Sequence, residues 1–73
     1  DAVYHHQNRL SMLTARETEV LSLVGEGLTY DRLAQRLSVS ESTIRVHIHN
    51  ICSKLGINRT ELIIYAAKQK SVN

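Results

Sequence analysis

The sequence predicts a single all-α domain, a four-helix bundle that contains a helix-turn-helix. Its 73 residues are 42% apolar, which is enough for one small core and too little for two. The chain has no proline, tryptophan or phenylalanine. Leucine, isoleucine, valine and alanine recur at helical spacing between residues that favour helix ends. The predicted helices cover about residues 15–26, 30–37, 41–55 and 59–70.

The opening residues 1–12 are expected to be a linker or tail, cut from a larger protein, ahead of a domain at 13–73. They lack an initiating methionine and a clear apolar period. Their adjacent histidines, His5 and His6, are too few ligands for a metal site. The predicted helices therefore all lie beyond this segment.

The first predicted helix begins after Thr14. Thr14 and Glu17 have the spacing of a capping box, in which the hydroxyl and the carboxylate each accept a hydrogen bond from a backbone N–H group. Apolar residues from Val20 to Val24 supply a core face. Gly27 is a typical residue for the end of such a helix.

Two further helices are predicted with only three residues between them, which is the layout of a helix-turn-helix. Thr29 and Ser40 are suited to cap them. Small Ala34 permits a close approach of the two helices, Val39 fills the turn, and Ile44 anchors the second helix on the core. Capped helices with short links are common, so this layout alone leaves the choice between binding DNA and binding another protein open.

The helix predicted at 41–55 has two distinct faces when it is wound at about 100° per residue. Its core face holds Ile44, His47, Ile48, Ile51 and Leu55. Its opposite face holds Ser42, Arg45, Val46, His49, Asn50 and Ser53. Arginine can bind guanine, histidine and asparagine can meet base edges, and valine can touch a thymine methyl group. This face is therefore suited to read bases, although a solvated helix face can also include a stray valine.

The last predicted helix carries more apolar surface than one core needs. Asn58 and Glu61 repeat the spacing of a capping box at its start. Ile63, Ile64 and Ala67 wind away from its core face. We expect these three residues to form a homodimer interface; the alternative is that the first helix covers them.

Charge is distributed unevenly along the chain. Residues 1–41 carry four basic and six acidic side chains, a net −2, whereas residues 42–73 carry five basic and one acidic, a net +4. Positive charge gathered on one part of a small domain is typical of proteins with an anionic partner, most often nucleic acid. Solvation alone is the other explanation.

Several function classes find no support in the sequence. Apolar runs are too short to span a bilayer, and a single cysteine, Cys52, forms no disulfide within the chain, which fits a cytoplasmic protein. Cys52 and His49 are three residues apart but lack further metal ligands. No nucleophile and base, paired carboxylates or phosphate-binding glycine loop is present. We therefore expect no enzyme activity, no metal and no cofactor.

The segment LTARETEVLSLVGEGLTYDRLAQRLSVSESTIRVHIHNICSKLGINRTEL resembles the LuxR-type (LuxR/FixJ) DNA-binding domain of bacterial transcription regulators, and the similarity extends from Leu13 to Ala67. Its marks are LTxRExEVL, LAxxL, SxxTIxxH, KLG and NRT, all in register. The resemblance implies double-stranded DNA recognition by the third helix and dimerisation through the fourth. It also implies the C-terminal output domain of a transcription regulator, with RNA polymerase as a further partner. The regulatory part stays open between a phosphorylatable receiver, as in two-component response regulators, a small-ligand domain and none.

The resemblance also assigns individual residues to the DNA. The expected base contacts are Arg45, Val46, His49 and Asn50. The expected phosphate contacts are Thr29, Tyr30, Ser40, Ser42, Thr43 and Lys54. Lys54 has an alternative role, because it could pair with a carboxylate of the first helix, Glu17 or Glu19. The rival to DNA binding is a small helical domain that binds another protein.

Overall fold

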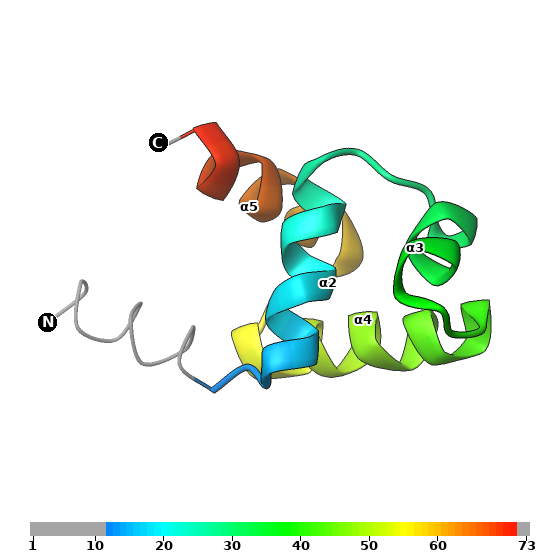
Figure 1. Ribbon diagram of the computed structural model, residues 1–73. Helices are drawn as coiled ribbons and strands as arrows, with labels where there is room; N and C mark the ends of the chain where they lie inside the picture. Colours follow the sequence, from blue (N-terminus) through cyan, green and yellow to red (C-terminus); the bar gives the residue numbers. More distant parts are fainter. Residues whose placement is uncertain (1–11, 72–73) are drawn as a thin grey trace, which may run out of the picture.

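The computed structural model describes residues 12–71, which form four α-helices and no strand (Figure 1). The helices are α2 (Ala15–Gly25), α3 (Tyr30–Leu37), α4 (Glu41–Leu55) and α5 (Arg59–Ser71). The all-α prediction is confirmed, and each helix boundary agrees with the predicted one to within a residue. Most of the expected linker, with His5 and His6, lies outside the described residues.

Both predicted capping boxes form. The N–H group of Glu17 donates to Oγ1 of Thr14 at 3.1 Å, and the N–H group of Thr14 donates to Oε1 of Glu17 at 3.0 Å. At α5, Asn58 and Glu61 exchange the equivalent two bonds at 2.9 and 2.8 Å. Local hydrogen bonds between residues three apart therefore define where these two helices begin.

The turn between α3 and α4 depends on a serine in an unusual conformation. Ser38 has a φ of 59°, in the left-handed region, and the N–H group of Val39 donates to the carbonyl oxygen of Ala34 at 3.0 Å. This is the hydrogen bond that ends many helices, usually around a glycine. Gly56, with a φ of 70°, has that role at the end of α4.

All four helices contribute to one core. The most fully buried side chains are Val20, Leu33, Ile44, Ile51 and Leu62, which come from α2, α3, α4, α4 and α5 respectively. α2 contacts each of the other three helices, and α3 packs on α4 (Figure 1). Only one face of α4 is buried in this core.

The helix-turn-helix packs as its small residues predict. Ala34 is 6% exposed on the side of α3 that meets α4, and Val39 in the turn packs against the core cluster. The Cα atoms of α3 and α5, in contrast, stay more than 8 Å apart. Any connection between α3 and α5 is therefore made by side chains and not by close packing of the backbones.

Candidate nucleic-acid interface

The two faces of α4 separate as the sequence predicts. Its buried face consists of Ile44, Ile48, Ile51 and Leu55, none more than 4% exposed. Its opposite face consists of exposed residues only: Ser42, Arg45, Val46, His49, Asn50 and Ser53. Because the core fixes the first face, the helix presents the second, mostly polar face to the surroundings in a fixed orientation.

Two residues of α4 depart from a simple division into a buried apolar face and an exposed polar face. Val46 is 57% exposed, so an aliphatic side chain stands within the polar face. His47, which the sequence placed in the core, is only half-buried. At about 100° per residue, position 47 falls 60° to one side of Ile44, at the margin of the buried stripe. That expectation needs correction: His47 borders the core and does not belong to it.

Arg45, on the exposed face, makes only weak contacts with its neighbours. Its Nη2 atom lies 3.5 Å from Oε1 of Glu41, one turn earlier, and the two side chains are 64% and 45% exposed. Its guanidinium carbon also lies 5.8 Å from the centre of the Tyr30 ring. Exposed pairs of this kind contribute at most about 1 kcal/mol, so a stronger partner can displace Glu41.

Two of the expected phosphate contacts, Thr29 and Ser40, also cap α3 and α4. Oγ1 of Thr29 accepts the N–H group of Arg32 at 3.3 Å, and Oγ of Ser40 accepts the N–H group of Thr43 at 3.1 Å. The hydroxyl groups of Ser40 and Thr43 lie 3.0 Å apart and share a hydrogen bond. These residues gather at two helix N-termini, which favour bound phosphate.

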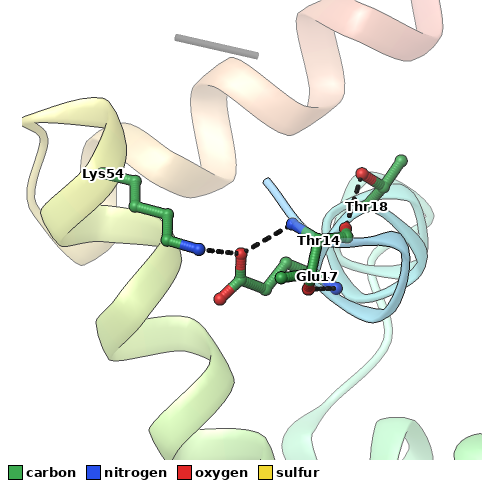
Figure 2. Close-up of polar contacts among 4 residues, drawn as sticks. All are labelled: Thr14, Glu17, Thr18 and Lys54. Carbon is green, nitrogen blue, oxygen red and sulfur yellow. Dashed lines mark hydrogen bonds and ion pairs between the residues drawn. The ribbon is translucent and has the colours of Figure 1, made fainter. Parts of the chain in front are cut away.

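Lys54 reaches from α4 to α2 and pairs with Glu17 (Figure 2). Its Nζ atom lies 2.7 Å from Oε1 of Glu17; the lysine side chain is 31% exposed and the glutamate 6%. The lysine hydrogen bond keeps the pKa of Glu17 below its ordinary value, burial opposes that shift, and the Thr14 N–H group adds to it. Glu19 pairs instead with Arg16, at 3.7 Å. Of the two carboxylates open to Lys54, the fold selects Glu17; a phosphate contact by Lys54 stays a prediction.

An open hollow of about 690 Å³ lies beside the exposed face of α4. It is lined by Tyr30 of α3, by Arg45 and His49 of α4, and by Arg59 of α5. Cys52 lines it too, and burial raises the pKa of this thiol while the charge of Arg59 opposes the rise. Arg59 was not among the residues predicted from the sequence to contact DNA; its signals there were its positive charge in the basic half of the chain and its place in the NRT motif.

The surface predicted to form a dimer remains exposed on α5. Leu62 and Ala66 are buried at 1% and 2% exposure, whereas Ile63 and Ile64 are 59% and 52% exposed. Ala67 is exposed as well. α2 packs against α5 without covering these three residues, which is contrary to the alternative considered above.

The described part of the chain shows neither a cluster of metal ligands nor a membrane-spanning helix. Between residues 12 and 71, no three histidine, cysteine, aspartate or glutamate side chains gather as a metal site would require. Within the same range, every helix is too short or too polar to cross a membrane.

Residues 11–66 match the family described as bacterial regulatory proteins, luxR family. The chain belongs to the LuxR family. The helix-turn-helix formed by α3 and α4 is thus part of a DNA-binding domain of transcription regulators, a family of regulators and not of enzymes. The resemblance found in the sequence is confirmed.

Relatives of this LuxR-family domain are regulators of several kinds. Transcriptional regulatory proteins LnrK and LiaR of Bacillus subtilis (strain 168) are 42% and 40% identical to it over 62 residues. These residues are 84% of this chain but 28% of LnrK and 29% of LiaR. The HTH-type transcriptional regulator MalT of Vibrio parahaemolyticus serotype O3:K6 is 46% identical over 59 residues, 80% of this chain and 6% of MalT. The chain therefore spans less than a third of each of these relatives.

Proposed function

We propose that this LuxR-family domain binds double-stranded DNA sequence-specifically, with α4 in the major groove. The observation that supports this most directly is the exposed face of α4, which is polar around Val46 and rigidly backed by the core. A major groove admits one α-helix, and its base pairs present distinct patterns of donors, acceptors and methyl groups. The face of α4 carries the matching chemistry.

Each of the four proposed base contacts is suited to a different feature of the base pairs. Arg45 has a planar group that binds O6 and N7 of guanine, and releasing Glu41 costs it little. Val46 offers its methyl groups to a thymine methyl. His49 and Asn50 lie about one turn further along the exposed face, where they can meet neighbouring bases.

The proposed phosphate contacts orient α4 and carry no sequence information themselves. Thr29, Ser40, Ser42 and Thr43 lie at or within the first turns of two helices, where backbone N–H groups and the helix dipole favour anions. Tyr30 and Lys54 complete the set. The ion pair with Glu17 leaves Lys54 the least available of the six.

The decisive experiment is selection of duplexes from a random pool, followed by binding at several salt concentrations. We expect an enriched sequence that binds roughly a thousandfold or more tightly than an unrelated duplex of equal length. We also expect the logarithm of the binding constant to fall steeply with the logarithm of salt concentration, since phosphate contacts release counterions. No measurable binding to any duplex would contradict the proposal and favour a protein-binding domain.

We further propose that two copies meet through Ile63, Ile64 and Ala67 of α5 on a pseudo-palindromic site. Two exposed isoleucines side by side support this, because burial against a second copy would remove them from water. Ile64→Glu should abolish self-association in analytical ultracentrifugation on DNA, whereas Gln69→Glu, which adds the same charge on α5, should not. Equal behaviour of the two variants would count against this interface.

We place the domain as the C-terminal output part of a cytoplasmic bacterial regulator. Its relatives LnrK, LiaR and MalT are named as transcriptional regulators and are each much longer than the matched region, which supports a composite protein. A two-component response regulator, with a phosphorylatable receiver, is the form we expect, with RNA polymerase as a partner at the promoter. Sequencing the complete gene would test this: a receiver in the same protein is expected, and a different regulatory region would contradict it.

A further inference from the structure

Three helices converge on the hollow beside α4, and their side chains meet at Tyr30. The guanidinium carbon of Arg45 lies 5.8 Å from the centre of the Tyr30 ring, and that of Arg59 lies 5.5 Å from it. Both distances are within the range of a cation–π contact. The ring thus attracts two guanidinium groups that would otherwise repel each other.

The contact with Arg59 links α5 to α3 in this region. The Cα atoms of these helices stay more than 8 Å apart, so the link is made by side chains. Arg59 is the first residue of α5, and the capping box of Asn58 and Glu61 fixes the backbone immediately around it. The helix start and the Tyr30 ring together set the position of its guanidinium group.

The charged groups around the hollow are not all paired. Arg45 has Glu41 as an acidic partner. Glu61 also lines the hollow, and its Oε1 atom accepts the N–H group of Asn58 at 2.9 Å. Among residues 12–71, none of the ion pairs includes Arg59. A guanidinium group has five N–H donors and binds phosphate through two parallel hydrogen bonds. Arg59 therefore lines the open hollow without an ion-pair partner among these residues, so its guanidinium group can bind a phosphate.

We propose that this hollow binds a phosphate of the DNA backbone, that Arg59 is the residue that contacts it, and that the Tyr30 ring positions both Arg59 and Arg45. The inference rests on the proposed function, because the phosphate belongs to the duplex that α4 reads. It places a phosphate contact on α5, outside the helix-turn-helix. It also replaces the phosphate contact proposed above for Tyr30 with a positioning role for its aromatic ring.

Substitution of Arg59 tests the phosphate contact. Arg59→Gln in the 73-residue chain should weaken binding to the selected duplex and to an unrelated duplex equally, by about threefold to tenfold, since the contact is to backbone. The slope of log binding constant against log salt concentration should become shallower by about 0.9, the value for one lost phosphate contact.

Arg36→Gln is the matched control, because Arg36 is an exposed arginine of α3 that does not line this hollow. It removes the same charge and should leave the salt slope unchanged. If Arg59→Gln leaves the slope at the wild-type value, or if Arg36→Gln lowers it equally, the proposed phosphate contact is wrong.

Two substitutions at Tyr30 separate its ring from its hydroxyl group. Tyr30→Phe keeps the ring and should bind within about twofold of the wild type with the same salt slope. Tyr30→Leu removes the ring and should lose at least as much affinity as Arg59→Gln. An equal loss in both variants would assign the role to the hydroxyl group and overturn the positioning role of the ring. Because Tyr30 is half-buried, thermal melting must first establish that the leucine variant is folded; Arg59, exposed, tests the site independently of that result.

These measurements also separate this inference from the proposed function. A wild-type chain that binds no duplex would refute the proposed function itself. A wild-type chain that binds with a steep salt slope, together with an unaffected Arg59→Gln variant, would refute the phosphate contact alone.

Discussion

α4 carries one ion pair near each end, and the two differ in burial and length. Near its start, Arg45 and Glu41 lie 3.5 Å apart on the same helix, with 64% and 45% of their side chains exposed. Near its end, Lys54 lies 2.7 Å from Glu17 of α2, with 31% and 6% exposed. One pair is a surface contact within a helix, and the other joins two helices.

This difference assigns different tasks to two basic residues of one helix. Salt and water screen the exposed pair, so Arg45 can leave Glu41 for DNA at small cost. Removal of Lys54 would leave a buried carboxylate with only the Thr14 N–H group as a partner, and an uncompensated buried charge is expensive. We therefore expect positive charge on α4 to serve DNA binding at the exposed end and the scaffold at the buried end.

The largest effect on folding is expected from Lys54→Met. We expect the free energy of unfolding, measured by urea denaturation, to fall by about 2–3 kcal/mol, at or below the lower end of the range for broken buried pairs because Lys54 is one-third exposed. The double variant Glu17→Gln/Lys54→Met should recover most of this loss, since glutamine also serves at this position of a capping box. If Lys54→Met lowers the free energy of unfolding by less than about 0.5 kcal/mol, the Lys54–Glu17 pair contributes no more to stability than an exposed ion pair.

A smaller effect is expected when acid protonates Glu17. Because the folded state lowers the pKa of Glu17, the stability that its ionised form contributes is fully present above the ordinary pKa of a glutamate and is lost as pH falls through the lowered value. The loss should be smaller than that of Lys54→Met, because the protonated carboxyl group keeps its place in the capping box. Urea denaturation at several pH values should show the stability difference between wild type and Glu17→Gln shrinking in acid. A constant difference would contradict this linkage.

The comparison also shows what the sequence can and cannot predict. Signals between residues three apart, such as Thr14 with Glu17, predicted the helix starts because the hydrogen bonds that make them are local. The partner of Lys54 was left open between Glu17 and Glu19, which are only two residues apart. The choice depends on how α2 crosses α4, and no local pattern encodes it.

Helical periodicity also could not predict how deeply a residue at the edge of the core is buried, or which side chains of different helices meet. The 100° rule separated the faces of α4 correctly but could not tell a buried position from a half-buried one at the edge, as at His47. The approach of Arg59 to Tyr30 requires the relative placement of α5 and α3, which is set by packing on α2. Long-range side-chain contacts of this kind come from the fold alone.

Arg45→Gln should have little effect on folding and a large one on recognition. The free energy of unfolding should change by less than about 0.5 kcal/mol, because the pair with Glu41 is exposed. Discrimination at one guanine of the selected duplex should fall by about 1–3 kcal/mol, measured as binding to the duplex and to a variant with that base pair changed. A loss of stability comparable to that of Lys54→Met would mean that the two ends of α4 do not differ in role.

The smallest effect on folding is expected from Val46→Ala on the exposed face. Val46 is 57% exposed, so its truncation should leave the free energy of unfolding nearly unchanged. Binding to the selected duplex should weaken by about 1 kcal/mol or somewhat more through loss of contact with one thymine methyl group. Replacing that thymine with uracil removes only the methyl group, so the wild type and Val46→Ala should bind the uracil duplex equally. If the variant is weaker on both duplexes by the same factor, Val46 does not touch that methyl group, and its exposure on α4 has another cause.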